Sequence, residues 1–74
     1  MRRNFIRDFG YDPTRPMPVV EEAYVRALRA IVGREGAKRR PTANEVHDAL
    51  PGDAPMGVWA IRLQLSALHR LHGL

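Results

Sequence analysis

The sequence predicts an all-α fold built from three helices. Apolar side chains recur at helical intervals in two long stretches, 19–34 and 54–72. Between them, a Thr-x-x-Glu sequence, which is typical of a helix start, marks a shorter helix over 42–50. The chain has 74 residues and no cysteine, so neither disulfides nor thiolate zinc sites can stabilise it. A small helical bundle or an oligomer is therefore the expected way to reach adequate stability.

Residues 1–18 are predicted to form an aromatic and basic arm followed by a proline-rich linker. Two phenylalanines and an isoleucine within 5–9 suit either a short helix ended by Gly10 or an arm whose aromatic rings dock on the body. The segment 12–18 contains three prolines, which exclude a helix. The helical domain is expected to span 19–74.

The stretch 19–34 is predicted to be an amphipathic helix that serves mainly as scaffold. Glu22 and Arg26, four residues apart, lie with Arg29 opposite the apolar stripe, and this charged face is expected to be solvated. Gly36 is expected just past the last turn, where a left-handed residue commonly ends a helix. The apolar stripe comprises Val20, Tyr24, Ala27, Leu28 and Ile31.

The second helix is expected over 42–50. Thr42 and Glu45 match a capping box, in which each side chain accepts the other residue's free amide, and Pro51-Gly52 ends the helix. Its apolar face consists of Val46, Ala49 and Leu50. A run of three cations precedes it and forms either a solvated loop or a phosphate-binding segment. These cations are Lys38, Arg39 and Arg40.

The third helix is expected over 54–72, with Asp53 as its N-cap, Pro55 in its first turn and Gly73 as its stop. Gly57 then lies inside the helix, at a cost of about 1 kcal/mol relative to alanine. Gln64 is expected at the rim of the core or in a subunit contact. The predicted core stripe is Val58, Ile61, Leu65 and Leu68, flanked by Ala60 and Leu71. The opposite side, called the outer face below, gathers Trp59, Arg62, Leu63, Ser66 and Arg70.

The charge distribution favours an anionic partner. The formal net charge is +4, and eleven of the twelve basic residues are arginine, which binds phosphates and carboxylates bidentately. A GC-rich genome would produce the same arginine excess. The two ends of the chain are its basic parts, which suits a polyanion or an acidic protein. Neither a signal peptide nor a membrane-spanning stretch is visible, so a cytoplasmic location is expected.

The order of these elements, a long helix, a short capped helix, a tight turn and a third helix, is that of a helix-turn-helix domain. More particularly, the segment from residue 40 onward resembles the winged helix-turn-helix of LexA-type repressors. That family begins its second helix with Pro-Thr-x-x-Glu-hydrophobic and ends its recognition helix with Leu-x-x-Leu followed by Gly and an apolar residue. The matching residues are Pro41, Thr42, Glu45, Val46, Leu50, Pro55, Leu65, Leu68, Gly73 and Leu74. In that family a β-hairpin wing begins at the position of Leu74, where this sequence ends. We therefore expect a wingless or truncated version of the domain.

By this resemblance, the third helix would enter the major groove of double-stranded DNA, and the protein would be a transcriptional repressor acting as a dimer. Arg62 would read guanine bidentately, and Ser66 would contact a base or the backbone. The expected phosphate contacts come from the cationic run, the C-terminal half of the last helix and the start of the second. They are Arg70, Lys38, Arg39, Arg40, Thr42 and Asn44. Arg2 and Arg3 would form a minor-groove arm.

The alternative is a protein-interaction module, such as a phage- or plasmid-type inhibitor of an acidic host protein. Trp59 and Leu63 lie one turn apart on the outer face beside Arg62, and tryptophan and arginine are favoured interface anchors. The same pair would also suit a homodimer. A third possibility is that Trp59 folds back onto the core against the N-terminal aromatic residues.

Catalysis, a cofactor and a metal site are not expected. The chain has no glycine-rich phosphate loop and few carboxylates. His69 and His72 lie three residues apart and could share a metal with His47. Histidines near the C-terminus of a helix are more often solvated or stabilised by the helix dipole, which is the interpretation adopted for both.

Overall fold

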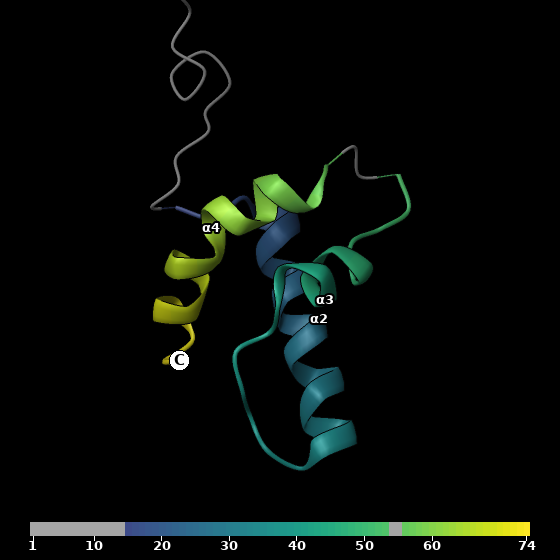
Figure 1. Cartoon of the computed structure of the whole chain (residues 1–74), viewed down its shortest axis with the longest axis vertical. Helices are drawn as coiled ribbons and strands as arrows, with labels where there is room; N and C mark the ends of the chain where they lie inside the picture. The colour runs from purple at the N-terminus through teal and green to yellow at the C-terminus, as the bar shows by residue number, and fades with distance from the viewer. Residues whose placement is uncertain (1–14, 54–55) are drawn as a thin grey trace, which may run out of the picture.

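The structure is a computed structural model that describes residues 15–53 and 56–74. Within these residues the chain forms three helices, α2 (Pro18–Glu35), α3 (Ala43–Asp48) and α4 (Val58–Leu71) (Figure 1). The predicted all-α, three-helix fold is confirmed. In the described part of the chain no helix is long and apolar enough to cross a membrane.

Helix α2 begins and ends close to the predicted positions. Pro18 occupies its first turn, where the missing amide hydrogen of proline has no helical partner to lose. Gly36 follows the last turn with a φ of 77°, and its N–H donates to the carbonyl of Val32 at 2.9 Å. This is the left-handed cap expected from the sequence. The whole apolar stripe is buried, and Ala23 joins it: Val20, Ala23, Tyr24, Ala27, Leu28 and Ile31.

Helix α3 starts at the predicted capping box. The Thr42 hydroxyl accepts from the Glu45 amide at 3.2 Å, and the Glu45 carboxylate accepts from the Thr42 amide at 2.8 Å. The helix ends at Asp48, before the predicted Leu50. Val46 is fully buried in the core, which it shares with side chains of both other helices. This short helix therefore joins α2 to α4 in one core.

Helix α4 begins later than the sequence predicts. Gly57, expected inside the helix, is its N-cap, with an extended backbone at φ −88° and ψ 166°. Asp53 is therefore not the cap, and Pro55 lies outside the described residues. Glycine is unfavourable inside a helix but is accepted at an N-cap, which explains the position of the boundary. The tight turn expected after α3 becomes a longer connection over 49–57.

The inner face of α4 also differs from the prediction at two positions. Ile61 and Leu68 are fully buried, as expected, and the predicted core residues Val58 and Leu65 are partly buried against them. Leu71, a predicted flank of the core, is 62% exposed because it lies in the last turn of the helix. Its predicted place in the core is therefore wrong. Gln64, described next, is the other position that differs.

Gln64 is fully buried within the chain, and its predicted place at a rim or subunit contact is wrong. Its Oε1 accepts from the backbone amide of Met17 at 2.8 Å, and its Nε2 donates to the carbonyl of Ala60 at 3.4 Å. Burying an amide side chain is tolerated when both of its ends are hydrogen-bonded. Gln64 thus ties the start of α2 to the middle of α4.

Candidate functional site

The outer face of α4 is exposed along its whole length. Trp59 is 67% exposed and Leu63 is 52% exposed, one turn apart. Arg62, Ser66 and Arg70 are exposed beside them on the same side of the helix, because positions three and four apart share a helix face. Trp59 is therefore not buried in the core, and the N-terminal aromatic segment against which it could have folded lies outside the described residues.

The outer face is basic and carries no acid. Helix α4 contains Arg62 and Arg70 but no aspartate or glutamate. Among the described residues, neither guanidinium forms an ion pair. In the part of the chain that the structure describes, the acidic side chains lie on α2, on α3 and in the connection that follows α3. This face therefore combines two uncompensated positive charges with two exposed apolar side chains.

Arg39, in the middle of the cationic run, is already engaged by carboxylates. Its guanidinium donates to Glu35 at 2.8 and 2.9 Å and to Glu45 at 2.8 Å through two nitrogens. These hydrogen bonds lower the pKa of Glu45 to about 2 and also lower that of Glu35, while the pKa of Arg39 rises. A phosphate would have to displace both carboxylates, so Arg39 is a weak candidate for the expected contact.

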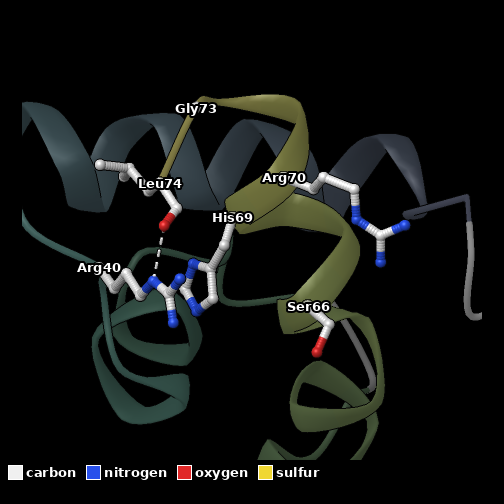
Figure 2. A pocket seen from close by; sticks show the side chains of 6 residues that line it. All are labelled: Arg40, Ser66, His69, Arg70, Gly73 and Leu74. Atoms are coloured by element: carbon white, nitrogen blue, oxygen red, sulfur yellow. Dashed lines mark hydrogen bonds between the residues drawn. The ribbon is translucent and has the colours of Figure 1, made fainter.

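Arg40, in contrast, lines a cleft with residues of α4. Its Nε donates to the backbone oxygen of Leu74 at 2.8 Å, which fixes the side chain against the end of the helix. The cleft is open to solvent and has a volume of about 450 Å³ (Figure 2). The fold thus brings three predicted phosphate or DNA contacts, which are distant in sequence, around one depression. The lining residues are Arg40, Ser66, His69, Arg70, Gly73 and Leu74.

His69 belongs to this cleft, although the sequence suggested only a solvated histidine. Its Nδ1 lies 2.9 Å from the hydroxyl of Tyr24, which is fully buried. Burial, with a smaller contribution from the charge of Arg40, lowers the pKa of His69. Burial raises the pKa of Tyr24. The sequence placed Tyr24 in the apolar stripe of α2. It could not reveal the hydrogen-bond partner of the Tyr24 hydroxyl, because that partner depends on how α2 and α4 cross.

The remaining predicted site residues lie apart from the cleft or outside the described residues. Asn44 and Lys38 are exposed, whereas the Thr42 hydroxyl is occupied by the capping hydrogen bond. Arg2 and Arg3 lie outside the described residues. Among the residues that the structure describes, no three histidine or carboxylate side chains are placed to hold a metal ion.

His72 also packs against α2. Its ring stacks on Tyr24 with centroids 5.0 Å apart, and its Nε2 lies 3.7 Å from a carboxylate oxygen of Glu21. That nitrogen is buried and has no hydrogen-bond partner among the described residues. His69, in the last turn of α4, and His72, its C-cap, thus both pack on the ring of Tyr24.

Comparison of the chain with models of protein families, with curated proteins and with solved structures finds no match in any of the three. The resemblance to LexA-type repressors accordingly stays a prediction. What the protein binds must be inferred from the outer face of α4 and the cleft beside it.

Proposed function

We propose that the protein binds double-stranded DNA through the outer face of α4 and acts as a transcriptional regulator. The observation that carries this proposal is the exposed row of Arg62, Ser66 and Arg70 on a helix without acids. Positive charge confined to one helix face is the electrostatic footprint of phosphate binding. Arg40 extends this footprint across the cleft.

The dimensions of α4 suit the major groove. The helix has 14 residues, so it is about 21 Å long at ~1.5 Å per residue. The major groove is about 12 Å wide and admits one helix with its side chains. In this proposal Arg62, in the N-terminal half, would read a guanine edge, with Ser66 one turn further along. Arg70 and Arg40 would contact phosphates, which set the register of the helix on the duplex.

The other predicted contacts are secondary parts of the same proposal. Lys38 and Asn44 would reach flanking phosphates, and Arg2 and Arg3 would supply a minor-groove arm. A dimer would place two copies on adjacent half-sites one helical turn apart. In that arrangement the outer face of α4 is occupied by DNA, so the two copies would pair through another surface. The cytoplasm is the location that this role requires.

The proposal is tested by titrating a labelled 20-base-pair duplex with the protein at two salt concentrations and following fluorescence anisotropy. Each phosphate contact contributes about 0.9 to the slope of log K against log salt. The double variant Arg62→Ala/Arg70→Ala should therefore bind more weakly, with a slope smaller by about 1–2.

The matched control is Arg26→Ala/Arg29→Ala, which removes the same charge from the exposed face of α2. It should keep most of the affinity and slope. Equal losses in both double variants would show that net charge, rather than the outer face of α4, determines binding. No binding of the unmodified protein at low salt would refute the proposal.

A protein partner is the second candidate, because the outer face exposes Trp59 and Leu63 as well as arginine. A tryptophan and a leucine one turn apart, flanked by cations, suit an acidic protein surface, as in a phage- or plasmid-type inhibitor of a host factor. The variant Trp59→Ala/Leu63→Ala separates the two candidates. DNA binding should change little in this variant, whereas binding to a protein through this face should be lost.

A further inference from the structure

The hydrogen bond between Tyr24 and His69 determines which imidazole nitrogen carries the proton. The Tyr24 hydroxyl is buried, and His69 Nδ1, at 2.9 Å, is its hydrogen-bond partner among the described residues. A buried phenol needs an acceptor for its proton, because an unsatisfied donor in the core is unfavourable. Nδ1 therefore accepts, and the proton of the neutral ring lies on Nε2. The fold thus selects one tautomer of His69.

The Nε2–H group of His69 is available to a ligand in the cleft. His69 lines the cleft and is only partly buried, and its Nε2 forms no hydrogen bond within the described residues. Within the described residues, the terminal nitrogens of Arg40 likewise form no hydrogen bond, since its Nε is the atom that binds Leu74. Figure 2 shows the Arg40 guanidinium next to the His69 ring.

The charges around the cleft favour an anion. Ser66 adds a hydroxyl, and Arg70 adds a second guanidinium on a side chain that Figure 2 shows turned away from Arg40. The helix dipole places about half a negative charge at the C-terminus of α4, and this partial charge repels an anion. Two arginines bring two full positive charges, and no side-chain carboxylate of the described residues lines the cleft. The main-chain oxygen of Leu74, which also lies at the cleft, is already bound by Arg40 Nε. The two guanidinium charges exceed the partial charge of the helix dipole.

We propose that this cleft binds a tetrahedral oxyanion, with the terminal nitrogens of Arg40 and Nε2–H of His69 as its donors. In the DNA complex the oxyanion would be a backbone phosphate, and this last step rests on the function proposed above. A free phosphate has the same chemistry and would use the same donors. Tyr24 acts as a positioning residue, because it holds His69 in the tautomer that donates.

The site makes anion binding dependent on pH. An oxyanion at Nε2 stabilises the protonated imidazole, so binding raises the pKa of His69 and affinity rises as pH falls. The other titratable and charged groups nearby are Tyr24 and Glu21 on α2, Arg40 before α3, Arg70 on its own helix, and His72 at the C-cap of that helix. Because His72 also lies against Tyr24, its imidazole signals must be assigned separately from those of His69.

The test is an NMR titration of the ¹⁵N-labelled protein with inorganic sulfate at pH 5.5 and pH 7.5. Sulfate keeps its charge across this range, whereas phosphate titrates near pH 6 and would confuse the result. The imidazole ¹⁵N signals of His69 should show the Nε2–H tautomer without ligand. The chemical shifts of His69 and Gly73 should change and reach a plateau as sulfate is added. Sulfate should bind at least threefold more tightly at pH 5.5 than at pH 7.5. The pKa of His69 should rise with sulfate.

Three variants make the result specific. Arg40→Gln should weaken sulfate binding at least fivefold, while Arg29→Gln on α2 should leave it within twofold. Tyr24→Phe should shift His69 toward a mixture of tautomers and weaken binding at pH 7.5 more than at pH 5.5, because the fraction of protonated rings, which donate from both nitrogens, grows as pH falls. Two-dimensional spectra confirm that each variant is folded. The proposed site would be overturned if the chemical shifts did not saturate with sulfate and were equal in the unmodified protein and in Arg40→Gln.

A short duplex separates this inference from the proposed function. DNA binding that shifts Arg62 but leaves His69 unchanged, and that Arg40→Gln does not weaken, would overturn the site while the function stands. Sulfate binding as described, together with no binding of the duplex at low salt, would support the site with a free oxyanion as ligand and refute the function. Shifts of His69 by both ligands would support both.

Discussion

At the scale of single residues, Gln64 is the buried polar side chain in the described core. Its carbonyl oxygen accepts from the amide of Met17, the N-cap residue of α2. The sequence placed Gln64 at the edge of the apolar stripe, which is where a helix tolerates a polar residue. Its burial follows from the position of residues 15–18 across α4, which no local pattern reveals.

Replacing Gln64 with methionine tests the contribution of these hydrogen bonds. The two side chains have similar length, so the substitution removes the hydrogen bonds and leaves little cavity. The partly buried Met17 amide would then lack its acceptor, and the free energy of unfolding should fall by about 1–3 kcal/mol. Urea denaturation followed by far-UV circular dichroism measures the change.

Ser66→Ala, on the exposed face of the same helix, serves as the control and should change stability by less than about 0.5 kcal/mol. A Gln64→Met variant as stable as the unmodified protein would mean that the Met17 amide finds another partner, such as water.

At the scale of elements, two glycines near the end of α2 have opposite roles. Gly36 caps the helix in the left-handed region at φ 77°, whereas Gly33 lies inside the helix, is exposed and has no heavy atom within 4 Å of an added Cβ. A left-handed cap favours glycine, while an interior position favours alanine. The same substitution should therefore change stability in opposite directions three residues apart.

Gly36→Ala should lower the free energy of unfolding by about 1 kcal/mol, because alanine is strained at positive φ. Gly33→Ala should raise it by about 0.5–1 kcal/mol through the higher helix propensity of alanine. Thermal unfolding of both variants under the same conditions checks the pair. Destabilisation by both substitutions would contradict the assigned end of α2.

At the scale of the whole molecule, ionisable groups couple the packing of the helices to pH. Arg39 joins Glu35 at the end of α2 to Glu45 in the first turn of α3, and the connection between these helices is held by this cluster. The Tyr24–His69 contact holds α4 on α2. Both contacts involve groups whose pKa is lowered in the folded protein.

The stability should therefore fall in two steps on acidification. His69 has a lowered pKa, so the unfolded chain takes up its proton first, and stability is lost as pH falls below about 6.5, the ordinary histidine value. Glu45 contributes stability above its ordinary pKa of 4.5, and this is lost as pH falls toward about 2. Urea denaturation at pH 7.5, 5.5 and 2.5 measures both steps.

The variant Glu45→Gln isolates the second step. Glutamine can still accept the Thr42 amide, so the capping box is kept and the ion pair with Arg39 is removed. Because the pair is partly exposed, the loss should be about 0.5–1 kcal/mol at pH 7.5. Most of this difference should be lost at pH 2.5, close to the folded-state pKa of about 2. A difference that stays constant from pH 7.5 to 2.5 would contradict the role of this carboxylate.

The local sequence was sufficient to predict where α2 and α3 begin, the glycine that ends α2, and which side of α4 is exposed. These features depend on neighbouring residues only: a capping box, a left-handed glycine, and apolar side chains spaced at one helical turn. The exposure of Trp59, Arg62 and Arg70 followed from the same periodicity. The start of α4 was misplaced because Asp53 and Pro55 also form a plausible helix start.

The tertiary structure decided the features that depend on how the helices cross. Packing α4 on α2 buries Gln64 and joins His69 to Tyr24 across 45 residues of sequence. The same packing sets Arg40 against the end of α4, while Arg39 turns to two carboxylates. Identical neighbours in a basic run thus acquire different chemistry, because Arg39 binds carboxylates four and six residues away, whereas the partner of Arg40 lies 34 residues away beyond the end of α4.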